Sequence, residues 1–376
     1  MNSLERKDAR YQRRKAKRNN DQYKDCDDFD KVFTYEHLYE SYKKARQNVA
    51  WKASVQSYIT EAPLKIYQTY EMLKEGIYVS RGFYEFDIFE RGKQRHIKSV
   101  CIDERVVQRC LCDYCLVPIL SRSFIYDNGA CLKDKGYTFA QNRVVKHLRD
   151  YYRHFGNDGY VLIFDFKKYF DNISHDVIKK ILHKAIKDER IIKQTEHFID
   201  MFGNVGVGLG SQISQIFALA VPNYLDHFIK EKLHIKYYGR YMDDGYLIHN
   251  SKEYLQYCLQ KISDICDKLG IKLNLKKTQI IKLSRGFTFL KAKFLISKTG
   301  KIIKRLARKS ITTMRRKLKK FIKKLNDKFT KKDVYQSYQS WRAYANNFDS
   351  HRTVCNIDKL YKKLFCTIEG DNLCVI

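Results

Sequence analysis

The sequence has 376 residues, in which 73 Lys and Arg outnumber 42 Asp and Glu to give a formal net charge of +31. This length excludes a small disulfide-stapled scaffold and allows two or three packed subdomains. So much positive charge repels itself in a compact chain unless a polyanion offsets it, and nucleic acid is the polyanion that we expect. The 14% aromatic content agrees, because bases stack on Tyr and Phe rings. A basic protein at a membrane surface is the alternative.

Eleven cysteines are spread along the chain from Cys26 to Cys374, and the N-terminus is charged where a signal peptide would be apolar. This pattern predicts reduced thiols in a cytoplasmic protein. No apolar run approaches the length that spans a membrane, so we expect no membrane segment.

The tightest cysteine group is Cys110, Cys112 and Cys115. A zinc site needs a fourth ligand, which Cys131 or His147 would supply only through an accident of the fold. A helix that carries small apolar residues is the interpretation that we prefer.

In chain order, residues 1–30 are polar and strongly charged, which predicts an arm that is solvated or ordered by a partner. From about residue 33 to 74 the apolar positions recur at helical spacing, and the whole chain contains only three prolines. The fold is therefore expected to be rich in helices. Further helices are predicted at 174–194, at 214–232 and from residue 311 onward.

Two segments between these helices have the pattern of strands. Residues 161–164 form a β-branched and aromatic run that ends at Asp165. Residues 238–249 predict two short strands joined by a turn that contains Asp243 and Asp244. The sequence thus predicts carboxylates at the ends of neighbouring strands.

Three other segments have distinctive compositions. Residues 203–210 contain four glycines, which predicts a flexible turn that can approach a ligand closely. Residues 287–295 predict another hairpin. Residues 301–332 hold fifteen Lys and Arg against the single acid Asp327. Within that window, apolar residues at helical spacing predict a helix with one apolar and one cationic face, able to follow a phosphate backbone: Ile311, Met314, Leu318, Phe321, Ile322 and Leu325.

The three aspartates suggest a chemistry. Two divalent ions about 4 Å apart assist phosphoryl transfer to a hydroxyl by activating the attacking oxygen and stabilising the leaving pyrophosphate. Mg²⁺ prefers carboxylate oxygens, and Mn²⁺ is an alternative. Asp165, Asp243 and Asp244 fit this plan, although an Asp-Asp pair alone is more often a surface turn.

The surroundings of these aspartates resemble a known family. Residues 164–173, 210–215 and 240–244 occur in the order and spacing of motifs A, B and C of reverse transcriptases, particularly the bacterial ones. Weaker resemblances place motif D at 270–278, the primer-grip hairpin at 287–294, and motifs of the fingers at 93–97 and 103–108. The resemblance covers roughly residues 65–330.

The resemblance implies an α+β fold, a right-hand polymerase with fingers, a palm of antiparallel sheet and helices, and a helical thumb. The expected divisions are a basic N-terminal extension at 1–60, fingers at 61–150, a palm at 151–300 with 178–210 partly in the fingers, and a basic thumb and tail at 301–376.

The resemblance also assigns site residues. Asp165, Asp243 and Asp244 become catalytic ligands of two Mg²⁺ ions, with the backbone carbonyl of Phe166 as a further ligand. Phe170 falls where the family places an aromatic gate that excludes a ribose 2'-hydroxyl, which favours dNTPs; ordinary core packing is the alternative. Other nucleotide contacts are expected from Arg95, Lys93, Leu209, Gly210, Gln215 and Lys277, the last as a proton donor to pyrophosphate. Primer and template contacts are expected from Tyr241, Met242, Lys304, Arg308, Arg315 and Arg316. For Arg95 and Lys93 a solvated loop is the alternative.

Motif B departs from the common pattern. Leu209 stands where a glutamine usually rests on the nucleotide, and Ser214-Gln215 ends the motif. This resembles the error-prone enzymes of diversity-generating retroelements, and defence-associated reverse transcriptases also vary here.

The resemblance therefore implies an RNA-directed DNA polymerase that uses dNTPs and a structured noncoding RNA template to make cDNA, with antiphage defence as the expected role. Alternatives are a diversity-generating retroelement enzyme, a group II intron protein and a catalytically silent RNA-binding scaffold. Only about 45 residues follow Lys332, so no accessory nuclease module is expected. A protein partner or a homo-oligomer is left open.

Overall fold

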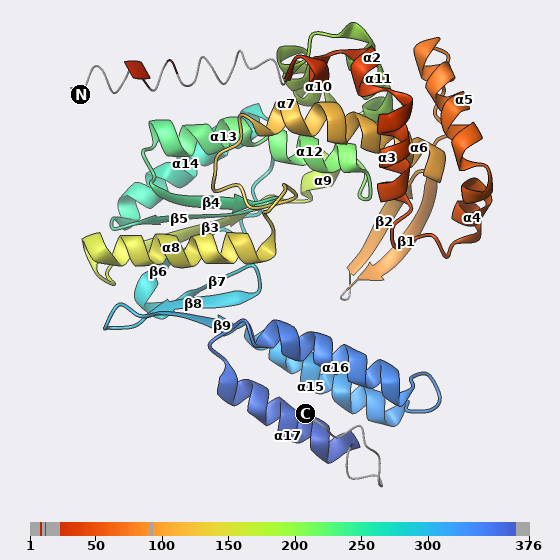
Figure 1. The fold of residues 1–376 in the computed structure, drawn as a ribbon. Coiled ribbons are helices and arrows are strands. Elements are labelled where there is room, and N and C mark those ends of the chain that lie inside the picture. Colours follow the sequence, from red (N-terminus) through yellow and green to blue (C-terminus); the bar gives the residue numbers. More distant parts are fainter. Residues whose placement is uncertain (1–7, 10–11, 13–22, 91–92, 366–376) are drawn as a thin grey trace. The chain divides into compact units, whose positions relative to one another are not determined.

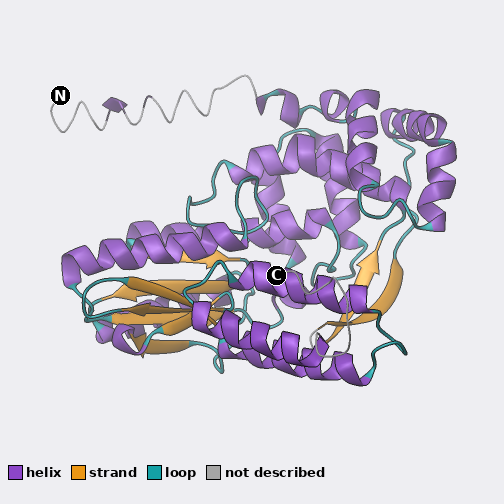
Figure 2. Cartoon of the chain, turned by 60° about the horizontal axis from the view of Figure 1, so that its bottom comes forward, coloured by secondary structure: helices purple, strands orange, loops and turns teal. Residues whose placement is uncertain are grey.

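The computed structural model describes residues 8–9, 12, 23–90 and 93–365. Most of the predicted N-terminal arm lies outside the described residues. Helices make up most of the described fold, and its strands gather in small antiparallel sheets (Figures 1 and 2). The chain divides into two compact units: residues 1–133, 166–232 and 261–273 form the first, and residues 134–165, 233–260 and 274–376 form the second.

The first unit is mostly helical, as the sequence predicts. Its α-helices are α2 (Phe29–Val32), α3 (Tyr35–Ala45), α4 (Ala53–Thr60), α5 (Ala62–Lys74), α6 (Ile102–Leu111), α7 (Val117–Ser121), α9 (Tyr169–Asn172), α10 (His175–Ala185), α11 (Glu189–Asp200), α12 (Gln212–Ala220) and α13 (Asn223–His227). Single turns of other helix types lie at Asp25–Asp27, Cys112–Leu116 and Phe228–Lys232. Helix α14 (Lys252–Lys268) begins in the second unit and ends in the first.

The first unit also contains a hairpin that the sequence pattern did not predict. Strands β1 (Tyr84–Glu90) and β2 (Lys93–Ser99) pair antiparallel with Tyr84 opposite Ser99. The apolar residues of β1 are exposed, and from Tyr84 to Ile88 they alternate with acids. This alternation is a strand signal that the sequence reasoning overlooked.

The cysteine group lies in helix, as preferred from the sequence. Cys110, Cys112 and Cys115 are buried, and burial raises the pKa of all three thiols. Within the described ranges no group of three or more His, Cys, Asp or Glu is placed to hold a metal ion. The structure therefore gives no support to a zinc site here.

The second unit is built on a four-stranded antiparallel sheet with the order β4-β5-β3-β6. Its strands are β3 (Tyr160–Asp165), β4 (Tyr237–Tyr241), β5 (Asp244–His249) and β6 (Gln279–Lys282). The strand at 161–164 and the two strands at 238–249 are confirmed, whereas β6 was not predicted. In the register of β3 and β5, Asp165 lies opposite Asp244.

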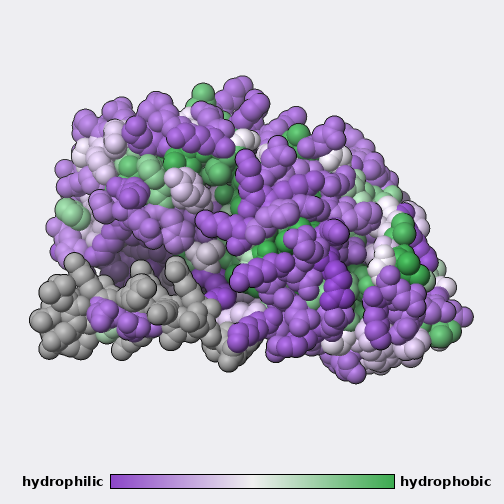
Figure 3. All heavy atoms as spheres, turned by 90° about the horizontal axis from the view of Figure 1, so that it is seen from above, coloured by the Kyte–Doolittle hydropathy of each residue, from purple (hydrophilic) through white to green (hydrophobic). Residues whose placement is uncertain are grey.

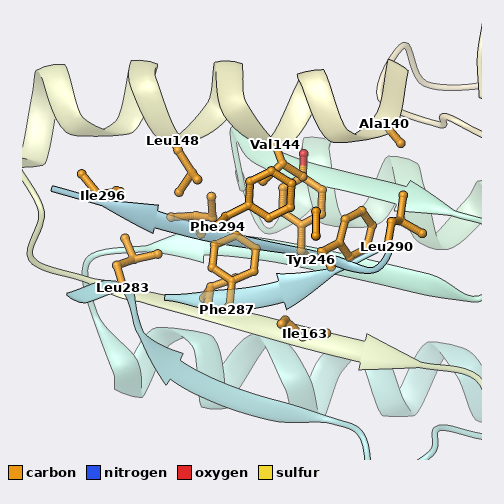
Figure 4. Packing of buried hydrophobic residues seen from close by; sticks show 14 of the residues in the cluster. Ala140, Val144, Leu148, Ile163, Tyr246, Leu283, Phe287, Leu290, Phe294 and Ile296 are labelled. Carbon is orange, nitrogen blue, oxygen red and sulfur yellow. The ribbon is translucent and has the colours of Figure 1, made fainter. Parts of the chain in front are cut away.

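Helix α8 (Tyr137–Phe155) covers this sheet in the second unit. Its apolar stripe, which includes Val144 and Leu148, packs against residues such as Tyr246 and Phe294 in one cluster (Figure 4). Burying each such side chain contributes roughly 1.5–3 kcal/mol. The boundary at residue 150 that the sequence suggested falls within this helix, because α8 packs with the sheet.

The rest of the second unit consists of a second sheet and three helices. Strands β7 (Phe287–Phe289), β8 (Ala292–Ile296) and β9 (Ile302–Leu306) form a three-stranded antiparallel sheet, which confirms the hairpin at 287–295. Strand β9 occupies the start of the window predicted to be a cationic helix, and a short 3-10 turn spans Leu283–Arg285.

Helices α15 (Arg308–Lys323), α16 (Lys331–Ala345) and α17 (His351–Phe365) form a bundle. The predicted apolar face of α15 is confirmed, because Met314, Leu318 and Phe321 are buried. Hydrophilic residues cover most of the face of the molecule seen in Figure 3. No helix in the described part of the chain is both long and apolar enough to cross a membrane.

A first prediction concerns Gly245 in β5. A Cβ added there would lie 2.2 Å from Phe164 Cζ, and that ring is fully buried in β3. Gly245→Ala should therefore lower the free energy of unfolding by about 1–3 kcal/mol through overpacking, as measured by denaturant melts. Gly136→Ala is the control, since an added Cβ meets nothing within 4 Å. Equal stability of the two variants would contradict this packing argument.

Candidate active site

The candidate site begins with the turn between β4 and β5. Tyr241 pairs with Asp244, so Met242 and Asp243 form a two-residue hairpin turn. Met242 has a φ of 53°, the sign that tight hairpin turns require and that a side chain makes costly. Arg240, which is only 1% exposed, donates from Nη1 to the Met242 carbonyl at 2.8 Å. A buried guanidinium therefore stabilises the turn.

Asp165 ends β3, directly opposite Asp244. It is 4% exposed, and its two carboxylate oxygens each accept a hydrogen bond from Lys277 Nζ at 2.8 Å. The Asn274 side-chain amide donates to Oδ2 at 2.9 Å, and the Asn274 backbone N–H donates to the Asp165 carbonyl at 2.8 Å. Asn274 and Lys277 thus fix the orientation of this carboxylate.

The carboxylates of this site repel one another. Burial, followed by the charge of Asp165, raises the pKa of Asp243. Burial, the charges of Asp243 and Asp165 and a shared hydrogen bond with Asp165 raise the pKa of Asp244 to about 7. For Lys277, burial alone would lower the pKa, but the hydrogen bond to Asp165 and the three negative charges raise it. The site therefore attracts cations.

The donor chemistry fits divalent metal ions, because hard carboxylate oxygens that repel one another stand close together. The geometry adds a condition. Over the described residues no set of three such side chains is already arranged around one metal position, and the Lys277 ammonium contacts both oxygens of Asp165. A metal ion at Asp165 requires Lys277 to turn away. The assignment of the three aspartates as metal ligands stays a prediction.

Lys277 was predicted to contact the nucleotide, and in this structure it contacts Asp165. Sequence reasoning also missed Asn274 and Arg240 as members of the site. The sequence offered only the spacing of Asn274 three residues before Lys277. In the structure these residues share a tight turn, in which the Lys277 N–H donates to the Asn274 carbonyl at 2.9 Å.

The predicted nucleotide contacts of the first unit are centred on a glycine segment, residues 203–211. Val207 N–H donates to the Phe170 carbonyl at 2.8 Å, and an added Cβ at Gly206 would lie 3.1 Å from that carbonyl. Phe170 is partly exposed beside the Tyr169 ring. The glycine segment therefore fixes the backbone of the predicted gate.

The same glycine segment approaches β2. A Cβ added at Gly208 would lie 3.2 Å from Lys98 Cβ, and one added at Gly210 would lie 3.6 Å from Ile97 Cγ2.

Leu209 is half-buried, and Gly210 and Gln215 are exposed. Arg95 and Lys93 lie on β2 opposite Ile88 and Glu90 in the backbone register, and their side chains lie outside the description. Phe166 is buried and forms a β-bridge with Leu273.

The predicted primer and template residues of the second unit separate into two sets. Tyr241 is half-buried, with its ring edge-on to Tyr137 at 5.7 Å, and Met242 is half-buried in the turn. Lys304 lies over the Phe348 ring at 4.8 Å, and burial lowers its pKa, so it takes part in packing. In contrast, Arg308, Arg315 and Arg316 are exposed on α15.

Asp244 supplies a pH-dependent prediction for the metal-free protein. The pKa of Asp244 is about 7 in the folded protein and about 3.9 in the unfolded chain. Between about pH 4 and pH 7 the folded state therefore binds more protons than the unfolded state. Stability should then fall as pH rises from about 4 to 7. Asp244→Asn removes this loss, so in EDTA the variant should melt a few degrees above wild type at pH 8 and at a similar temperature at pH 4.

Asp327→Asn, an exposed change in the α15–α16 connection, is the matched control and should melt as wild type does at both pH values. A lower melting temperature for Asp244→Asn at pH 8 would show that carboxylate repulsion does not strain the fold.

Comparison with known proteins identifies the family. Residues 82–294, more than half of the chain, match the family described as reverse transcriptase (RNA-dependent DNA polymerase). No curated protein matches the chain. Among solved structures, the chain is similar to telomerase from Candida albicans in complex with the TWJ fragment of telomeric RNA, at 14% identity and a TM-score of 0.47, covering 77% of this chain and 55% of that one.

It is also similar to apo telomerase from Candida tropicalis, at 16% identity and a TM-score of 0.47, covering 77% of this chain and 64% of that one. The chain thus spans less than two thirds of the length of these structures. The sequence match and the mixed fold of helices and antiparallel sheets confirm the predicted class and family. This chain belongs to the reverse transcriptase family.

Proposed function

We propose that this chain is an RNA-directed DNA polymerase that joins dNTPs into cDNA along an RNA template. One observation carries the proposal: Asp165 and Asp244 lie side by side on neighbouring strands, and Asp243 lies in the adjoining turn. Nucleotidyl transfer needs negative oxygen ligands gathered at one edge of a rigid sheet, because small displacements of reacting groups are costly.

In this proposal, two Mg²⁺ ions, or Mn²⁺ in their place, held by the three aspartates would activate the attacking hydroxyl and stabilise the leaving pyrophosphate. The chain's own residues position those ligands. Asn274 holds the Asp165 carboxylate, and Arg240 holds the turn that carries Asp243. Lys277, when it leaves Asp165, places a cation beside the site, where it would offset charge on the triphosphate.

Selection of dNTPs is supported by Phe170. Its backbone is tied to the glycine segment, and its ring is partly exposed, so it is available to a nucleotide. An aromatic ring accepts no ordinary hydrogen bond from a 2'-hydroxyl and leaves it little room. We propose that Leu209, Gly210, Gln215, Arg95 and Lys93 complete the nucleotide contacts.

The proposed template is a structured RNA bound partly by the thumb, helices α15 to α17. Met314, Leu318 and Phe321 turn inward from α15, so its other face presents Arg308, Arg315 and Arg316. Exposed cations on one helix suit contacts with RNA phosphates.

For the biological setting we propose antiphage defence with a dedicated noncoding RNA. The support is the departure at Leu209 from the glutamine of the common motif. The same feature favours a second candidate, an error-prone enzyme of a diversity-generating retroelement. Sequencing of the copurifying RNA and its cDNA product distinguishes them, since only the second predicts frequent substitutions opposite template bases.

The enzyme proposal is tested by Asp243→Ala. The change removes a carboxylate of the site, so dNTP incorporation on an RNA template should fall by more than about 10³-fold, as expected when a group acting in the transition state is lost. RNA affinity should change less than about twofold, since a carboxylate offers no positive charge to an RNA phosphate. Asp327→Ala serves as the exposed control. Undiminished incorporation would refute the polymerase, and inactive wild type with intact RNA binding would favour the silent scaffold.

The RNA surface is tested by the pair Arg315→Ala and Arg316→Ala. Each lost phosphate contact should reduce the slope of log affinity against log salt by about one, so the double variant should lose about two. Lys180→Ala with Lys184→Ala on α10 is the control for net charge, because both lysines are exposed at helical spacing. Equal slopes for the two double variants would remove α15 from the RNA surface.

A further inference from the structure

Helix α6 carries buried polar side chains that join two segments distant in sequence. Glu104 and Gln108, one helical turn apart, are 1% and 3% exposed. Gln108 Nε2 donates to Glu104 Oε1 at 2.9 Å, and Ser211 Oγ donates to Gln108 Oε1 at 3.0 Å. At the other end, Glu104 Oε2 accepts from the Ser80 hydroxyl and from the Arg81 backbone N–H at 3.2 Å. These five residues form a continuous relay within the first unit.

The direction of the relay follows from its chemistry. The Arg81 N–H can only donate, so Glu104 Oε2 must accept from it. The Gln108 amide turns its NH₂ group to the other oxygen of Glu104, Oε1, and its own oxygen to Ser211. The Ser211 hydroxyl proton is then committed to Gln108. Ser211 is the N-cap residue of α12 but makes no capping hydrogen bond with its side chain, although serine commonly caps a helix.

The relay ends at two places that bear on the nucleotide contacts. Ser80 and Arg81 precede β1, and on the other strand Arg105 Nη2 donates to Ser99 Oγ at 3.0 Å. Helix α6 therefore contacts the segment that leads into β1 and the last residue of β2. Ser211 closes the glycine segment, which packs against β2 and fixes the Phe170 backbone.

A neighbouring contact attaches α12 to the same part of the chain. Gln212 Nε2 donates to Asp113 Oδ1 at 2.8 Å, and Lys44 and Arg109 make ion pairs with Asp113 Oδ2. Two consecutive residues thus hold the start of α12. Ser211 bonds to Gln108 of the buried Glu104–Gln108 pair, and Gln212 bonds to Asp113.

We propose that Gln108 and Glu104 are positioning residues that set the glycine segment against the β1–β2 hairpin and thereby control the affinity for the incoming dNTP. The inference rests on the proposed polymerase activity. Neither residue touches substrate; both act through Ser211. A buried polar chain with every member satisfied favours one arrangement of the segments that it joins.

The test compares Gln108→Leu, Ser211→Ala and the double variant on a poly(rA) template with an oligo(dT) primer. Each single change should raise the KM for dTTP about tenfold, the size expected for lost hydrogen bonds, with kcat changed less than twofold. The double variant should be no worse than the single ones, because the two changes break the same link. Gln194→Leu on α11 is the control, since its amide nitrogen is buried without a partner.

If the relay is merely structural, the variants should lose stability without a change in the KM for dTTP. If the two residues act independently, the increases in KM of the single variants should multiply in the double variant. Either result overturns the proposal. Ser211→Ala removes only one oxygen and keeps the test open if Gln108→Leu fails to fold.

Hydrogen–deuterium exchange separates this inference from the proposed function. Gln108→Leu and Ser211→Ala should speed amide exchange in residues 205–211, and Gln194→Leu should not. If wild type incorporates no dNTP, the proposed function fails and exchange alone decides whether the relay holds the glycine segment. If amide exchange in residues 205–211 is unchanged in both Gln108→Leu and Ser211→Ala, the positioning role of the relay is overturned.

Discussion

The repulsion among three carboxylates at one sheet edge is the constraint on which the rest of the second unit depends. Asp165 and Asp244 are fixed opposite each other by the register of β3 and β5, so the strands cannot move apart to relieve the repulsion without breaking the ladder, and proton uptake by Asp244 relieves it instead. The fold opposes it with Lys277 and Asn274 on Asp165 and with Arg240 on the turn. A site arranged in this way stores unfavourable energy that ligand binding can release, which is the usual relation between stability and function at active sites.

Local patterns explain why much of this site could be predicted from the sequence. The run that ends at Asp165 and the pair Asp243 and Asp244 between two short strands depend on nearest neighbours, and the order of three motifs identified the family. The apolar stripe of α15 was likewise visible, because helical periodicity is local. The predicted strands and most predicted helices were confirmed.

What the sequence did not predict depends on contacts between distant residues. Asn274 orients a carboxylate 109 positions away, and no spacing rule gives that distance. Strand β9 was hidden in a run of lysine and arginine, whereas the alternation of apolar residues and acids in β1 was a local signal that went unused. Lys304 has the charge of a phosphate contact, yet it lies over the Phe348 ring. The predicted roles of Phe170, Leu209 and the α15 arginines stay predictions.

The close approach of Gly245 to the Phe164 ring has a consequence for how this site can vary among relatives. The residue after the aspartate pair and the residue before Asp165 share one space, so their sizes are not independent. A relative with a larger residue at the position of Gly245 should carry a smaller one at the position of Phe164. Covariation of these two positions would then report the packing behind the site, separately from the carboxylates themselves.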